Sequence, residues 1–174
     1  MAGKKATAGL GPIVSSEHLS HQARELSEFE FGLIISSHAF NRWIVRCMTA
    51  AGYSELSPLD VLVVHSVNHR QRPKKLSDIC LVLNVEDSHT VSYALKKLMR
   101  LELVTSQKQG KETLFHTTEK GQQACRTYAE IREACLVDSL STLGISPEEM
   151  HRLAGAMRAF SGIYDQASRA AAAF

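Results

Sequence analysis

Polar and basic side chains recur at helical spacing within residues 88–101 of this chain. In a helix, a spacing of three or four residues brings such side chains onto one face. The residues concerned are Ser88, His89, Ser92, Tyr93, Lys96 and Arg100. Their groups can donate hydrogen bonds or carry positive charge, which suits contacts with nucleic-acid bases and phosphates. Helix capping and simple solvent exposure of the same groups is the alternative interpretation.

Further basic residues flank this segment on both sides. They are Arg70, Arg72, Lys74 and Lys75 before it, and Lys108 and Lys111 after it. Residues 69–120 contain ten Lys or Arg and six Asp or Glu, whereas the whole chain has a formal net charge of only +2. Positive charge is therefore concentrated here, as neutralisation of phosphates requires. A solvated helix face beside a solvated turn would carry the same charge, so charge alone leaves both interpretations open.

Other residues capable of site chemistry are isolated. His65 and His69 are four residues apart and could share a metal ion, but no HExxH glutamate accompanies them, which favours a helix surface or packing role. Cys47 lies in an apolar pattern, which favours a buried thiol over a redox sensor. The four cysteines, Cys47, Cys80, Cys125 and Cys135, show no CxxC spacing, which predicts reduced thiols in an intracellular protein.

Motifs of catalysis and of targeting are missing from the sequence. It has no GxSxG elbow, no P-loop glycine set and no paired carboxylates with a plausible pocket, so we expect neither enzymatic activity nor a cofactor. No apolar run reaches about 18 residues, so no membrane span is expected. Lys4 and Lys5 have no apolar core behind them, so no secretory signal is expected.

Three elements are predicted to position the polar and basic groups. Asp87 is the expected N-cap of a helix over 88–101, and Ser77 is the expected N-cap of the helix before it. The buried stripes of these two helices would comprise Val91, Ala94, Leu95 and Leu98, and Leu76, Ile79, Cys80 and Leu83, respectively. Two β-prone runs surround Lys108-Gln109-Gly110-Lys111 and predict a hairpin over 103–116 with a basic tip.

Long helices are predicted on the N-terminal side of this unit. Residues 17–51 carry an apolar residue every seven positions, at Leu26, Leu33, Phe40 and Cys47. Gly52 would end this helix, and Ser57-Pro58 would open a second helix over 58–68. Residues 1–16 are rich in Gly, Ala and Ser and should form a flexible tail.

Two further helices are predicted on the C-terminal side. Thr118 can cap a helix that runs to about residue 143, where Gly144 would break it. Ser146-Pro147 would open the last helix, with acidic residues in its first turn. The apolar stripe of this last helix comprises Met150, Leu153, Met157, Phe160 and Tyr164.

The order of these segments resembles that of the multiple-antibiotic-resistance regulator (MarR) family of bacterial winged-helix transcription factors. The matching run covers residues 56–121 and contains, in family order, LSPLDVLVVHSV, LSDICLVLNV, TVSYALKKLMRLELV and TTEKG. The resemblance implies a mostly α fold with a small β-hairpin wing. A winged helix-turn-helix lobe at 52–118 would lie between dimerisation helices at 17–51 and 119–174.

The resemblance also implies partners. It suggests a cytoplasmic homodimer that binds a pseudo-palindromic site in double-stranded DNA. Residues 88–101 would be the recognition helix in the major groove, and the wing at 103–116 would lie on the backbone or in the minor groove. A small aromatic or acidic effector, bound between the dimer helices and the lobe, is a further implication.

The sequence departs from the family pattern at three points. Glu102 stands where the family usually has Gly, KQGKET lacks the Asp-x-Arg element of the wing, and NVED is one residue longer than usual. The first two departures favour an alternative, a winged-helix protein-interaction module without sequence-specific DNA binding. A ligand or metal sensor is the third class of function, beside the interaction module and the DNA-binding regulator.

Overall fold

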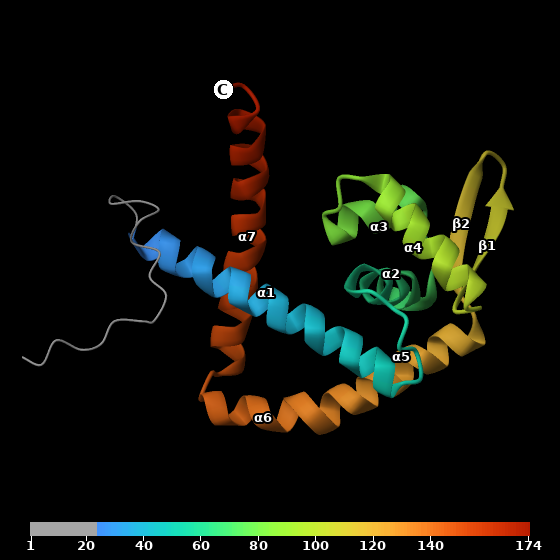
Figure 1. Ribbon diagram of the computed structural model, residues 1–174, viewed down its shortest axis with the longest axis horizontal. Helices are drawn as coiled ribbons and strands as arrows, with labels where there is room; N and C mark the ends of the chain where they lie inside the picture. Colours follow the sequence, from blue (N-terminus) through green and yellow to red (C-terminus); the bar gives the residue numbers. More distant parts are fainter. Residues whose placement is uncertain (1–23) are drawn as a thin grey trace, which may run out of the picture. The chain divides into compact units, whose positions relative to one another are not determined.

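The computed structural model describes residues 24–174, apart from the side chains of residues 138 and 141. The predicted tail at 1–16 and the first residues of the predicted helix at 17–51 lie outside the described residues. The chain divides into two compact units, of which the first ends at Tyr128 and the second spans Ala129–Phe174 (Figure 1). No helix among the described residues is long and apolar enough to cross a membrane.

Over its described residues, from Arg24 on, the first unit contains five α-helices and a β-hairpin (Figure 1). Its elements are α1 (Arg24–Ala50), α2 (Pro58–Asn68), η1 (His69–Gln71), α3 (Leu76–Leu83), α4 (Ser88–Arg100), β1 (Val104–Gln109), β2 (Glu112–Thr117) and α5 (Glu119–Arg132), which continues into the second unit. The expected fold class, mostly α with a small hairpin, is confirmed.

Helix starts follow the predicted capping residues with one exception. Ser57 accepts a hydrogen bond from the Asp60 N–H, and the Asp60 carboxylate accepts one from the Ser57 N–H, which completes a capping box. Asp87 caps α4 as expected. The prediction of Ser77 as the N-cap of α3 is wrong. The helix begins at Leu76, because the Asp78 carboxylate accepts the Lys75 N–H at 3.2 Å and makes Lys75 the cap residue.

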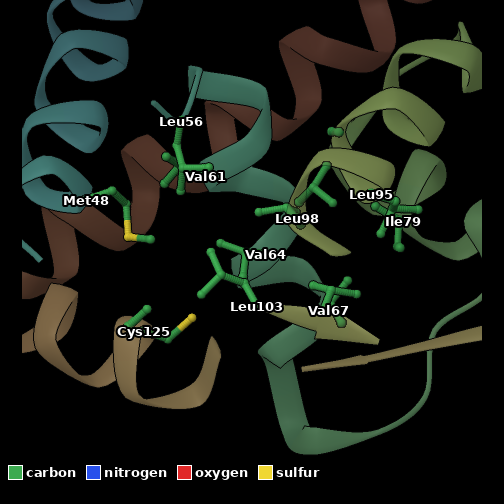
Figure 2. Packing of buried hydrophobic residues seen from close by; sticks show 14 of the residues in the cluster. Met48, Leu56, Val61, Val64, Val67, Ile79, Leu95, Leu98, Leu103 and Cys125 are labelled. Atoms are coloured by element: carbon green, nitrogen blue, oxygen red, sulfur yellow. The ribbon is translucent and has the colours of Figure 1, made fainter. Parts of the chain in front are cut away.

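The core of the first unit is centred on α2 and α4, and α1, α3, β1 and α5 also contribute buried side chains to it. The α4 stripe is buried as predicted, with Val91, Ala94, Leu95 and Leu98 all at most 4% exposed. Figure 2 shows this core extending from Met48 on α1 through Val64 on α2 to Cys125 on α5. Side chains of this size contribute about 1.5–3 kcal/mol each when buried. The core therefore holds α4 with one face inward and fixes which of its residues face outward.

The wing is a two-stranded antiparallel hairpin. Gln109 pairs with Glu112, which leaves Gly110 and Lys111 as a two-residue loop. Gly110 has a φ of 62°, and positive φ at the first loop position only is the pattern of a type II′ turn. Lys108 therefore lies within β1 opposite Thr113, not in the turn as predicted. Twist-compatible two-residue turns let the strands pair to their ends, which explains the difference.

The second unit begins within the helical run that Thr118 caps. Its elements are η2 (Glu133–Val137), α6 (Asp138–Leu140), η3 (Ser141–Leu143) and α7 (Pro147–Ala171). The predicted single helix to residue 143 is thus one helical run that changes from α-helix to a π-helical turn at η2. Gly144, with a φ of 63°, ends it. Ser146 then caps α7 through a capping box with Glu149, as predicted.

Candidate DNA-binding face

The outer face of α4 carries the predicted polar and basic side chains. Ser88, His89, Tyr93, Lys96 and Arg100 are exposed, and Ser92 is half-buried. Tyr93 exposes 71% of its surface, although a tyrosine of this size gains free energy from burial. The structure therefore brings the predicted α4 residues together on one surface.

The N-terminus of α4 is closed by its own cap. The Asp87 carboxylate accepts the His89 N–H at 2.9 Å, and the Thr90 hydroxyl donates to the Asp87 carbonyl at 2.8 Å. The His89 N–H and the Thr90 hydroxyl are therefore already hydrogen-bonded to Asp87. The side chains of Ser88 and His89 remain at the positive end of the helix dipole, where an anion is favoured.

Tyr93 and Lys96 form a local pair at the middle of the face. The Lys96 ammonium lies 5.5 Å from the centroid of the Tyr93 ring, within the range of a cation–π contact. The two side chains line a shallow hollow together with Met99 and Arg100. This hollow combines apolar surface with two cations. It can therefore hold an apolar group, such as a thymine methyl, beside an anionic or acceptor group.

Lys97 differs from its neighbour Lys96, and sequence reasoning did not single it out. Its ammonium donates to the Asp60 carboxylate at 2.7 Å and to the Glu55 carbonyl at 2.6 Å. Asp60 is 4% exposed and also accepts a hydrogen bond from Ser57, so the pair of buried Asp60 and half-buried Lys97 joins α4 to the start of α2. Lys97 lies about 100° around the helix from Lys96, which turns it away from the outer face.

The linker lysines are tied to the wing. The Lys75 ammonium lies 2.7 Å from the Glu112 carboxylate at the start of β2, and this hydrogen bond raises the pKa of Lys75. The backbone of Lys74 exchanges two hydrogen bonds with Phe115, at 3.0 Å and 2.9 Å. Lys75, a predicted phosphate contact, thus has a carboxylate partner in the structure. Arg72 is exposed and Lys74 is half-buried.

Glu102 adopts the conformation that a glycine would favour. Its φ is 60°, in the left-handed region. Its carbonyl accepts the Thr118 hydroxyl, and its carboxylate lies 3.4 Å from the Lys120 ammonium. Glu102 therefore adopts, between α4 and β1, a backbone conformation that a glycine would adopt without steric cost.

The histidines and cysteines occupy different environments. The ring of His65 packs edge-on against Tyr128 with centroids 4.4 Å apart, and burial lowers its pKa. The described residues contain no cluster of three or more potential metal ligands. Cys47 is buried as expected from its apolar pattern. Burial raises the pKa of Cys125 to about 11, which disfavours its reactive thiolate form, whereas Cys135 is exposed.

Comparison with known proteins places these features in a known fold. Residues 56–121 match the model of a winged helix DNA-binding domain. AbfR of Staphylococcus epidermidis superposes with a TM-score of 0.66 and 19% identity, over 83% of this chain and 94% of that chain. Reduced AbfR bound to DNA gives a TM-score of 0.65 and 18% identity, over 82% of this chain and 96% of that chain.

A second neighbour is itself a MarR protein. Staphylococcus aureus MarR in complex with salicylate and kanamycin superposes with a TM-score of 0.65 and 13% identity, over 88% of this chain and 99% of that chain. No curated protein matches the sequence significantly. Residues 56–121 thus resemble a winged helix DNA-binding domain, and the chain shares its fold with the S. aureus MarR protein. The resemblance read from the sequence is confirmed for the fold.

Proposed function

We propose that this protein is a dimeric transcription regulator that binds double-stranded DNA. In this proposal α4, predicted at 88–101, enters the major groove, and the wing lies on the backbone or in the minor groove. The observation that carries the proposal is the exposed face of His89, Tyr93, Lys96 and Arg100 over a fully buried stripe, inside a segment that matches a winged helix DNA-binding domain. The buried stripe anchors the helix in the lobe, so that the polar and basic side chains on its outer face are free to contact base edges and phosphates.

A second copy of the chain is the proposed partner in the cytoplasm. Apolar side chains on α1 and α7 are exposed, among them Phe40 at 51% and Leu153 at 51%. A two-fold dimer would cover such faces and would match the symmetry of a pseudo-palindromic DNA site. A small-molecule effector is the remaining part of the proposal, supported by the salicylate and kanamycin bound to one structural neighbour.

Selection from a random DNA pool tests the proposal directly. The purified protein is incubated with random duplexes, and the bound fragments are amplified and sequenced over several rounds. We expect a motif with two related halves about 10 base pairs apart, because two recognition helices read successive turns of one face. Binding should weaken steeply as salt rises. Recovery of fragments without a shared motif would contradict sequence-specific reading.

The interaction module is the second candidate function, and α3 supplies an observation in its favour. Leu81 and Val82 are 81% and 73% exposed, next to each other on the first helix of the helix-turn-helix. Exposed apolar patches often mark protein-binding surfaces. A module of this kind would show no salt-dependent binding to any duplex in the selection experiment, which separates it from the regulator.

A further inference from the structure

The hollow on the outer face of α4 has an apolar part that contact with phosphates does not explain. Tyr93, which is 71% exposed, and Met99 supply this apolar surface. The other two lining residues, Lys96 and Arg100, are cations. Residues 88–100 contain no Asp or Glu, and no ion pair among the described residues involves either cation. The hollow thus joins exposed apolar surface to two cations without a carboxylate partner.

The chemistry of the major groove limits what can fill the apolar part of the hollow. The 5-methyl group of thymine is the only alkyl group that the four base pairs present there. The other groups are hydrogen-bond donors or acceptors, which an apolar wall would leave unsatisfied. 5-Methylcytosine carries a methyl group at the same ring position as thymine. The group that fits against Tyr93 and Met99 is therefore the 5-methyl group of a pyrimidine.

The cations of the hollow indicate the neighbouring base. The Lys96 ammonium lies 5.5 Å from the centroid of the Tyr93 ring. Successive bases of one strand are about 3.4 Å apart along the duplex axis, so a ring and an ammonium at this separation can meet neighbouring base pairs. Guanine presents two acceptors in the major groove, O6 and N7, and is the commonest specific partner of Arg and Lys. A methylated pyrimidine next to a guanine fits both parts of the hollow.

We propose that α4 reads a 5-methyl pyrimidine next to a guanine, with Tyr93 and Met99 against the methyl group and Lys96 on guanine O6 and N7. Thymine meets this requirement, and cytosine meets it only when it is methylated at C5. The inference rests on the proposed function, DNA reading by α4, and adds the chemical group that the helix selects. It also adds a form of regulation, because methylation of a cytosine at this position strengthens binding without a change of sequence.

Two changes in the DNA isolate the methyl group. Each thymine of the selected duplex is replaced in turn by deoxyuridine, which lacks only the methyl group, and binding is measured by fluorescence anisotropy at fixed salt. Binding should weaken about fourfold at one position in each half of the motif, because burial of one methyl group corresponds to a factor of this size. At that position, a duplex with 5-methylcytosine should bind more tightly than one with cytosine by the same factor.

Matched variants assign the methyl contact to Tyr93. Tyr93→Ala should bind the thymine and deoxyuridine duplexes equally, because the surface that packs on the methyl group is gone. Tyr93→Phe keeps the ring and should retain the parental ratio of the two affinities. Lys111→Ala, in the loop of the wing, is the control. Whatever its effect on affinity, it should leave this ratio at the parental value.

Failure of this inference differs from failure of the proposed function. A selected motif whose binding is unaffected by every deoxyuridine replacement overturns the inference and leaves DNA reading intact. Equal affinities for cytosine and 5-methylcytosine have the same consequence, as does a parental ratio in Tyr93→Ala or a lost ratio in Tyr93→Phe. Selection that returns no shared motif overturns both.

Discussion

At the scale of single residues, Glu102 shows how a departure from a family pattern is accommodated. The turn after α4 needs a left-handed residue whichever side chain stands there, because Leu103 must turn inward to its fully buried position in the core. A glutamate at a φ of 60° carries a steric cost that a glycine does not. The exposed contact with Lys120 at 3.4 Å recovers little of this cost.

Replacing Glu102 by glycine should therefore stabilise the protein. Relief of the left-handed conformation is worth about 1–2 kcal/mol, and the greater chain entropy of unfolded glycine removes about 0.5–1 kcal/mol of it. We expect a net gain of about 0.5–1 kcal/mol in the free energy of unfolding, measured by urea denaturation. Glu130→Gly, within α5, is the matched control, and it should lower the free energy of unfolding by about 1 kcal/mol. A loss at Glu102 equal to that of the control would show that the turn is not strained.

Gly121 is required for a different reason, the close approach of two backbones. A Cβ at this position would overlap the Leu103 carbonyl group, which is backbone and cannot move aside as a side chain can. Gly121→Ala should destabilise the lobe by about 1–3 kcal/mol or more. Gly162→Ala is the control, because a Cβ at this position in α7 meets open space. Since alanine is favoured over glycine within a helix, this change should raise the free energy of unfolding by about 0.5–1 kcal/mol. Thermal melting of both variants measures the difference.

At the scale of elements, α4 gives the sharpest test of DNA reading. Tyr93→Ala and Lys96→Ala remove groups from the outer face, and each lost base contact should cost about 1–3 kcal/mol at particular base positions. The effect is measured as binding to the selected duplex and to its single-base variants. Leu95→Ala is the control for folding and should lower stability by about 2–5 kcal/mol, because it opens a cavity beneath the helix. Parental binding by the folded double variant would exclude α4 as the reader.

The wing calls for a separate test, because its two lysines differ in position. Lys111 lies in the loop and Lys108 lies within β1, and both are exposed. If both contact phosphates, replacing both by Ala should weaken binding to all sequences alike and should reduce the slope of log affinity against log salt by about 1–2 units. Single variants then show which lysine contributes. A slope equal to that of the parent protein would remove the wing from the interface.

Local signals in the sequence predicted most of these elements. Apolar spacing and the capping residues Ser57, Asp87 and Ser146 marked helix starts correctly, because both signals act within one turn of helix. The exception at Ser77 has the same physical origin. A side chain three residues after the cap, here Asp78, can complete a cap whose own residue is lysine. Sequence patterns that consider only the cap residue miss this arrangement.

Long-range partners could not be predicted in this way. Lys97 and Asp60 are 37 residues apart, and so are Lys75 and Glu112. Which of two adjacent lysines, Lys96 or Lys97, turns inward depends on the position of α2, which no local pattern encodes. The sequence therefore indicated the exposed polar face of α4 but not the ion pair that joins this helix to α2.

At the scale of the whole molecule, exposed apolar surface on the terminal helices remains to be covered. No described residue of α7 is buried within the chain, although the helix carries a continuous apolar stripe. Met150, Leu153 and Met157 on that stripe are 41%, 51% and 50% exposed. Stable interfaces usually bury about 1,200–2,000 Å² in total, and stripes of this kind on several helices can supply that area. A two-fold dimer is the simplest arrangement that covers them.

Light scattering at micromolar concentration should therefore give about twice the chain mass of 19.2 kDa. Leu153→Arg combined with Met157→Arg should dissociate the dimer, because it places charge in an apolar interface. Gln166→Arg, on the opposite side of α7, should leave the mass unchanged. The dissociated variant should also bind the selected DNA far more weakly, since two recognition helices about one DNA turn, roughly 34 Å, apart act together only in a dimer. A monomeric parent protein would contradict this prediction.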